Sequence, residues 1–205
     1  MIAIIDYDAG NLKSVEKALA YLGHPCIITR DRHEILQAEH VILPGVGAFS
    51  DAMHQLKKYE LDKVICEVAD RRIPLLGICL GLQLLFEGSE EGAGEEGLGL
   101  LSGHIVRFSP DHGLKIPQIG WNSLTLQNDG RLFRGIADGS YVYFVHSYYL
   151  KATDPSIVKA TTLYGDLVHA SVEQDNLFAC QFHPEKSGRV GLSILDHFAR
   201  IGEEA

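Results

Sequence analysis

Residues 73–86 read IPLLGICLGLQLLF, and this stretch decides the fold. Its first part is a short, almost unbroken apolar run, which predicts a buried strand over 74–78. Its second part, 80–86, has the composition of a buried helix, and only the turn at Cys79 separates the two. A strand covered on both faces and followed directly by a helix is typical of a parallel sheet in an α/β protein.

The residues before this stretch repeat the same alternation. We expect strands at 2–5, 26–29 and 40–43, because each is an apolar run bounded by polar or turn residues. Apolar residues at helical spacing predict helices over 12–22 and about 50–72. Asp31 and Glu34 together form a start signal for a short helix. Strands that alternate with helices predict βαβ units.

After Gly97 the alternation of strand and helix patterns ends, and strand patterns predominate. Residues 105–108, 141–150, 157–163 and 167–182 are typical of strands and hairpins, and a closing helix is expected over about 189–201. We therefore predict one α/β domain over 1–205. Its core is a doubly wound, mostly parallel sheet flanked by helices, with an antiparallel β extension in the C-terminal half.

Composition and charge exclude several classes of protein. The 205 residues include 18 basic and 27 acidic side chains, a net charge of −9, which disfavours binding to nucleic acid or to an anionic membrane face. The first residues lack the basic start of a signal peptide, and no apolar run is long enough to span a bilayer. Four cysteines without a C-x-x-C pair predict a reducing, cytoplasmic compartment. The Glu- and Gly-rich segment 87–97 is typical of a solvated loop.

Residues 77–81, GICLG, match a nucleophile elbow with Cys79 at its apex. Glycines flank the apex because side chains there would clash on so tight a turn. The N-terminus of the following helix favours the thiolate, and the N–H of Leu80 can point at a developing oxyanion. The alternative is a buried structural cysteine.

A cysteine nucleophile needs a base, and His183 in QFHPEKS (181–187) is the best candidate. It follows an apolar strand pattern, and Glu185 is near enough to orient its imidazole. A surface His-Pro turn is the alternative. A zinc site made of Cys79, His183 and Glu185 is disfavoured, because no short-spaced ligand pair occurs. We therefore predict no metal and no cofactor.

The segment PGVGAF (44–49) follows the strand predicted at 40–43. Its two close glycines would let backbone N–H groups approach a ligand, although a plain turn is the alternative. Ligands in open α/β sheets bind outside the carboxyl ends of the strands. The segment and the elbow both follow parallel-type strands, so we expect them at the same edge of the sheet.

Together, GICLGLQ (77–83), QFHPEKS and PGVGAF resemble the class I, triad-type glutamine amidotransferases. Three further segments, DYDAGNL (6–12), PQIGWN (117–122) and VHSYY (145–149), are similar to the glutaminase subunits of imidazole glycerol phosphate synthases. The resemblance runs essentially end to end. Three positions depart from that pattern: Asp8 is more often glycine, Gln118 is more often histidine, and Leu82 is often methionine.

The resemblance implies that glutamine is hydrolysed to glutamate and ammonia through a Cys79–His183–Glu185 triad. It implies a heterodimer with a barrel cyclase that uses the ammonia in histidine biosynthesis. It also assigns roles to other residues. The backbone of Leu80, Val46 and Gly47 would hold the oxyanion; Gly45, Gln83, Ser147 and Tyr148 would bind the substrate; and Asn11, Trp121, Asn122 and Lys186 would face the cyclase.

Other interpretations stay open at this point. The chain could serve another amidotransferase, such as one of purine or pyridoxal phosphate synthesis. A peptidase or esterase could use the same elbow, and a non-catalytic docking subunit could retain the fold. Trp121 could be a buried structural residue rather than an interface anchor.

Overall fold

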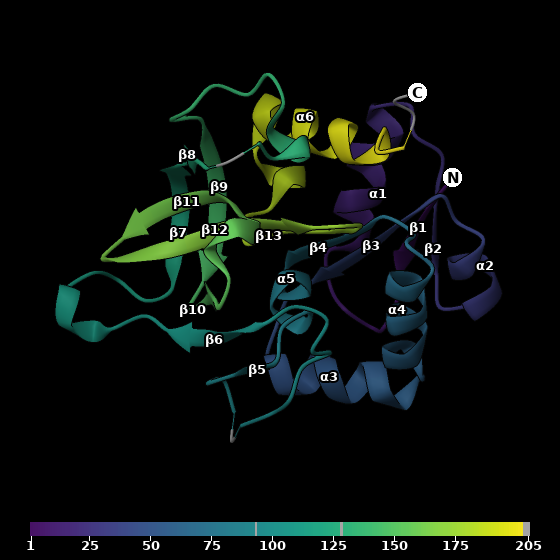
Figure 1. The fold of residues 1–205 in the computed structure, drawn as a ribbon, viewed down its shortest axis with the longest axis horizontal. Coiled ribbons are helices and arrows are strands. Elements are labelled where there is room, and N and C mark those ends of the chain that lie inside the picture. Colours follow the sequence, from purple (N-terminus) through teal and green to yellow (C-terminus); the bar gives the residue numbers. More distant parts are fainter. Residues whose placement is uncertain (93, 128, 203–205) are drawn as a thin grey trace.

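The computed structural model describes residues 1–92, 94–127 and 129–202. Within these residues, eight strands form one sheet in the order β2-β1-β3-β4-β13-β12-β11-β8 (Figure 1). The first five are parallel neighbours: β2 (Cys26–Thr29), β1 (Ile2–Ile5), β3 (His40–Gly45), β4 (Leu75–Cys79) and β13 (Leu177–Cys180). The last three continue the sheet with antiparallel pairing: β12 (Asp166–Gln174), β11 (Val158–Tyr164) and β8 (Thr125–Leu126). The predicted fold class is confirmed.

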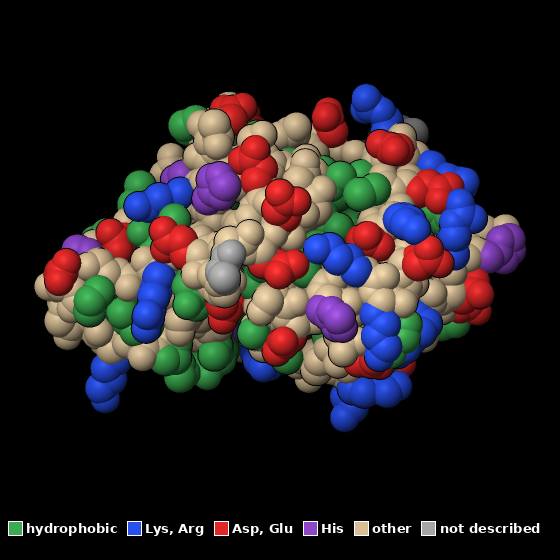
Figure 2. Space-filling model, turned by 90° about the horizontal axis from the view of Figure 1, so that it is seen from below, with side chains coloured by type: hydrophobic (Ala, Val, Ile, Leu, Met, Phe, Trp, Pro, Cys, Tyr) green, Lys and Arg blue, Asp and Glu red, His purple; other side chains and the backbone are tan. Residues whose placement is uncertain are grey.

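Helices cover both faces of the parallel part, which explains why its strands are apolar on both sides. In β1, Ile2 and Ile4 belong to one core, and Ala3 and Ile5 belong to the other. The first core is covered by α1 (Leu12–Tyr21) and α6 (Gly188–Ala199). The second is covered by α2 (Arg32–Leu36), α3 (Phe49–Lys58) and α4 (Leu61–Asp70). Figure 2 shows acidic and basic side chains interspersed on the face of the molecule below the sheet of Figure 1.

The helix predicted over about 50–72 is wrong in one respect, because it is two helices. The chain breaks between α3 and α4 at Glu60, which has a left-handed φ of 55°. Leu56 before the break and Leu61 after it are both buried in the same core. Each half has apolar residues at helical spacing, so the pattern predicts one helix where the structure has two.

The strand predicted over 141–150 also divides. Its first part, β9 (Tyr141–His146), pairs antiparallel with β7 (Gln118–Ser123) in a two-stranded ribbon. Its second part, β10 (Tyr148–Ala152), pairs with β6 (Gly103–Arg107) in a three-stranded sheet that ends at β5 (Gly88–Ser89). Ser147 lies where the chain passes from one sheet to the other. Among the described residues, no helix has the length and apolarity to cross a membrane.

The carboxyl edge of the parallel strands carries the segments that the sequence singled out. In the β3–β4 pair, Gly45 lies opposite Cys79, and in the β13–β4 pair Cys180 lies opposite Ile78. The expectation that PGVGAF and the elbow share one edge is confirmed. The chain leaving β13 at this edge leads directly to His183.

Candidate active site

Cys79 sits at the apex of a sharp turn between β4 and the short helix α5 (Leu80–Leu84). Its backbone has φ 54° and ψ −106°, a conformation that a residue with a side chain rarely adopts. The flanking glycines make this turn possible. A Cβ on Gly77 would lie 2.7 Å from the carbonyl oxygen of Gly81, and one on Gly81 would overlap the carbonyl of Leu43. The geometry is that of a nucleophile elbow.

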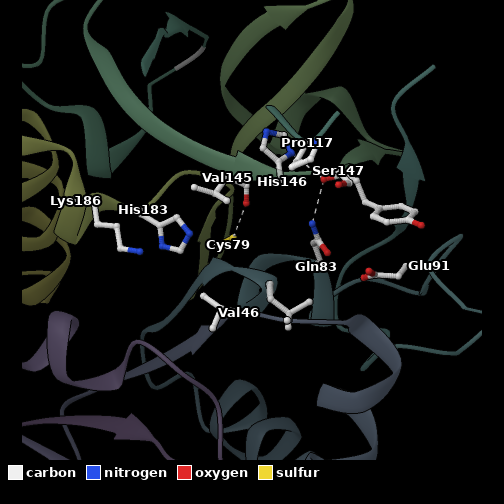
Figure 3. Close-up of a pocket in the computed structure, with 13 residues that line it drawn as sticks. Val46, Cys79, Gln83, Glu91, Pro117, Val145, His146, Ser147, His183 and Lys186 are labelled. Carbon is white, nitrogen blue, oxygen red and sulfur yellow. Dashed lines mark hydrogen bonds between the residues drawn. The ribbon is translucent and has the colours of Figure 1, made fainter. Parts of the chain in front are cut away.

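His183 follows β13 and is almost completely buried. A single turn of 3₁₀ helix, Pro184–Lys186, brings Glu185 back beneath it, so that the imidazole Nδ1 donates to Glu185 Oε1 at 2.8 Å. The Glu185 side chain is also buried, and its other oxygen, Oε2, has no partner in the structure. The imidazole of His183 is turned toward Cys79 (Figure 3).

The electrostatics of His183 favour its charged form. Burial acts to lower its pKa, but hydrogen bonds to Cys79 and Glu185, together with their negative charges, outweigh burial and raise the pKa to about 9. A charged His183 therefore lies between Cys79 and Glu185. A cysteine paired with an imidazolium is the arrangement that activates a cysteine nucleophile.

Two further groups contact the Cys79 sulfur. The sulfur lies 3.8 Å from the carbonyl oxygen of Val145, and the Nε2 of Gln181 lies 3.7 Å from the sulfur. Gln83 connects this contact to the wall of the pocket, because its Nε2 donates both to Gln181 Oε1 and to the carbonyl of Tyr148. Gln181 is a residue to which no sequence motif had assigned a role.

Cys79 and His183 open into a cavity of about 280 Å³. The cavity also contains most of the residues assigned to the oxyanion and the substrate: Val46, Gly47, Leu80, Gln83, Ser147 and Tyr148. Gly45 is the exception. It is buried behind this lining, where a Cβ would lie 2.9 Å from Leu80 Cβ and would overlap the hydroxyl of Tyr7. A side chain at this position would therefore prevent the close packing behind the elbow.

Glu91 lines the same cavity and was missed by the sequence analysis. The acidic segment 87–97 was predicted to be solvated, but one oxygen of Glu91 accepts from the N–H of Phe49 at the start of α3, at 2.9 Å. Figure 3 shows the Glu91 carboxylate and the Gln83 Oε1 on the same side of the cavity, away from His183. Two oxygen acceptors at this end suit a substrate ammonium group.

His146 is a second lining residue that the sequence analysis did not select. Its Nδ1 donates to the carbonyl of Tyr148 at 2.8 Å, and its Nε2 lies 3.0 Å from the Gln118 carboxamide. Burial is the main cause that lowers its pKa to about 4, and the positive charge of His183 adds to the effect. His146 is therefore neutral at physiological pH, and His183 is the histidine that carries charge in this cavity.

The four residues assigned to the partner surface lie in different surroundings. Trp121 is 54% exposed, with its ring edge-on to Tyr143, so the buried alternative is wrong. Asn122 donates to the carbonyl of Leu163 in β11, and Lys186 lines the cavity. Asn11 is half-buried, and its Nδ2 donates to Glu185 Oε1 at 2.6 Å. Asn11 thus contacts the triad itself.

Two alternatives, a reactive Cys180 and a metal site, find no support among the described residues. Cys180 is completely buried, and burial raises the pKa of its thiol, which is the behaviour of a packing residue. Over the ranges that the structure describes, no group of three His, Cys, Asp or Glu side chains could hold a metal ion.

Comparison with known proteins places this site in a family. The profile of the family "Glutamine amidotransferase class-I" matches residues 3–200. The imidazole glycerol phosphate synthase subunit HisH of Moorella thermoacetica is 52% identical over 204 residues, which is 100% of this chain and 96% of that protein. The same subunit of Thermosynechococcus vestitus is 51% identical over 202 residues, which is 98% of this chain and 96% of that protein. The chain belongs to the class-I glutamine amidotransferases, in the family of subunit HisH.

Solved structures of class-I amidotransferases share the fold. A structure described as a glutamine amidotransferase superposes with a TM-score of 0.74 at 19% identity, covering 97% of this chain and 99% of its own. The structure of PurLQS from Thermotoga maritima superposes with a TM-score of 0.72 at 20% identity, covering 98% of this chain and 97% of its own. At such low identity these structures show only that the fold is shared. The family is shown by the relatives that are about 50% identical.

Proposed function

We propose that this chain is the glutaminase subunit of an imidazole glycerol phosphate synthase. It would hydrolyse glutamine to glutamate and ammonia and supply the ammonia to a barrel cyclase in histidine biosynthesis. The names and full-length identity of its relatives support the pathway. The observation that carries the chemistry is the buried pairing of Cys79, His183 and Glu185 at the floor of a cavity of amino-acid size.

The cavity sets the direction of the substrate. The substrate ammonium would lie between Glu91 and the Gln83 Oε1, and the side-chain amide would reach Cys79 at the other end. Only Oε1 of Gln83 serves this purpose, because its Nε2 is held by Tyr148 and Gln181. Ser147 and Tyr148 also line the cavity.

Acylation begins with the thiolate of Cys79, which attacks the amide carbon and forms a carbon–sulfur bond. The charge moves to the amide oxygen, where the N–H of Leu80 and an N–H from Val46–Gly47 would hold it; one such donor contributes about 3 kcal/mol in comparable acyl transfers. His183 gives its proton to the departing nitrogen, and ammonia leaves as the carbon–nitrogen bond breaks. A glutamyl thioester remains.

Deacylation reverses the roles at the same atoms. His183, now neutral, takes a proton from water, whose oxygen attacks the thioester carbon. The carbon–sulfur bond breaks, glutamate leaves, and His183 keeps the proton opposite the restored thiolate. Glu185 stabilises the imidazolium at both stages, and Asn11 holds the same carboxylate oxygen.

The partner surface would lie around the mouth of this cavity. Trp121 and Ile119 are both exposed and lie on the same face of β7, which suits an apolar anchor for a second subunit. Lys186 and Asn11 would extend this surface to the triad. We propose a cytoplasmic heterodimer in which the partner switches on hydrolysis. Gly47, with φ 107°, allows the adjacent peptide to change orientation.

The test measures ammonia release from glutamine by the purified chain, alone and with the barrel cyclase and its nucleotide ligand. Cys79→Ala is the matched control. Strong stimulation by the cyclase, lost in the control, would support both the nucleophile and the partner.

Other outcomes would contradict defined parts of the proposal. High turnover by the isolated chain would refute partner control, and equal activity with and without the cyclase would refute the choice of partner. Cleavage of esters or peptides without ammonia release would indicate a hydrolase of another kind. Unchanged ammonia release by Cys79→Ala would refute the triad mechanism.

A further inference from the structure

Gln181 is a completely buried polar residue at the end of β13. Its backbone N–H donates to the carbonyl of Ala170 at 2.8 Å, so the strand position is satisfied without the side chain. The carboxamide projects instead to the elbow, between Gln83 and the Cys79 sulfur. A buried carboxamide is costly unless its groups are bonded, so these two contacts determine what it does there.

The network fixes which end of the carboxamide faces the sulfur. A backbone carbonyl only accepts, so the group of Gln83 that lies 3.2 Å from the carbonyl of Tyr148 must be its NH₂. The same NH₂ lies 3.1 Å from Gln181, which must therefore present its carbonyl oxygen to Gln83. The NH₂ of Gln181 is left for the Cys79 sulfur, at 3.7 Å.

We propose that Gln181 is a catalytic residue, which donates a hydrogen bond from Nε2 to the Cys79 sulfur and stabilises its thiolate form. The catalytic step that Gln181 would assist rests on the proposed function, whereas its contact with the sulfur does not. An amide donor does not titrate in the working pH range, so it faces the sulfur throughout the cycle. His183, in contrast, gives up its proton during acylation.

This constancy matters most when the thioester breaks. The carbon–sulfur bond then returns its electron pair to sulfur, and the developing negative charge needs a donor at that moment. Gln181 is already in place, because Gln83 holds its carbonyl and the surrounding strands hold its backbone. A donor that is fixed in advance requires no reorganisation during the reaction.

The test compares two identical substitutions at buried glutamines. Gln181→Met removes the donor and keeps the length of the side chain. Gln118→Met makes the same change at a residue that is also buried but bonds to His146 and not to the sulfur. For each chain, the alkylation rate of the Cys79 peptide by iodoacetamide is followed by mass spectrometry from pH 5 to 10, without glutamine. Mass spectrometry separates Cys79 from the other three cysteines.

We expect the midpoint of the Cys79 alkylation curve to move upward by about one pH unit in Gln181→Met, the effect of losing a hydrogen bond to a charged group. In Gln118→Met the midpoint should stay in place. With glutamine and the partner, Gln181→Met should lower kcat about tenfold and change KM little. An unchanged midpoint in a folded Gln181→Met chain would overturn the proposal.

A measurement on the unsubstituted chain covers the case in which Gln181→Met does not fold. The side-chain NH₂ resonances of ¹⁵N-labelled chain are compared before and after alkylation of Cys79. The Gln181 signal should shift, while that of Gln118 should not; equal shifts, or none, would overturn the proposal. Neither the alkylation curve nor this spectrum needs glutaminase activity. A failure of the proposed function is therefore distinguishable from a failure of this inference.

Discussion

Protonation of His146 is expected to destabilise the folded chain in mild acid. This side chain is 6% exposed, and its ring packs against Phe108 and Phe144, with centroids at 5.1 and 5.5 Å. Burial lowers its pKa from 6.5 to about 4. Between these values the unfolded chain binds a proton that the folded chain does not, so the free energy of unfolding falls as the pH falls.

The size of the effect follows from the two pKa values. At about 1.4 kcal/mol per pKa unit, protonation of His146 lowers the free energy of unfolding by about 3 kcal/mol in total. About 2 kcal/mol of this decrease occurs between pH 7 and pH 5. His183 acts in another range, because its pKa is raised to about 9. The charged form of His183 adds to the free energy of unfolding. This stabilisation is complete below about pH 6.5 and is lost as the pH rises through about 9.

The assay is urea unfolding at pH 7 and pH 5 for the unsubstituted chain and for His146→Asn. Asparagine keeps a donor near the Nδ1 position, toward the carbonyl of Tyr148, but does not titrate. Contributions from His183, and from His169, whose pKa burial also lowers, are common to both chains and cancel. The unsubstituted chain should lose about 2 kcal/mol more than the variant. Equal losses would refute the reasoning.

Three further changes test the site. Asn11→Ala removes the hydrogen bond to Glu185 and should lower kcat about tenfold, with little change in Tm; an unchanged kcat would show that the contact is incidental. Glu185→Gln removes a charge that helps raise the pKa of His183, so the alkaline decline of kcat/KM, expected near pH 9, should move to lower pH. Gly81→Ala places a Cβ against the carbonyl of Leu43 and should lower Tm sharply; a normal Tm would contradict the elbow geometry.

Local rules were sufficient to predict the elbow and its place in the sheet. Gly77 and Gly81 reveal a turn too tight for side chains, and the steric contacts in the structure have that cause. Parallel strands end at one edge, which is why two apolar runs were enough to place PGVGAF and the elbow at the same edge of the sheet. The register that sets Gly45 opposite Cys79 came only with the structure. Such features depend on backbone geometry and short-range pattern, which a single sequence contains.

Contacts between distant segments could not be predicted in the same way. Asn11 was assigned to the surface by resemblance, but its amide reaches Glu185, far along the chain. Glu91 stands in a segment whose composition indicates solvation, yet one N–H of α3 holds its carboxylate at the cavity. Gln181 ends an apolar strand, and nothing in the alternation of residues shows that its carboxamide meets a sulfur. These positions depend on how separate elements pack.

The central place of β13 in the sheet has a consequence for the newly synthesised chain. The ribosome completes β1 to β4 long before it reaches β13, so the cysteine emerges far ahead of its base. β13 then has to enter between β4 and β12, where it pairs with both. Pairings between distant segments form late, because the closure of a long loop precedes any gain. A partly translated chain therefore has Cys79 but lacks His183. It cannot hydrolyse glutamine until β13 has joined the sheet.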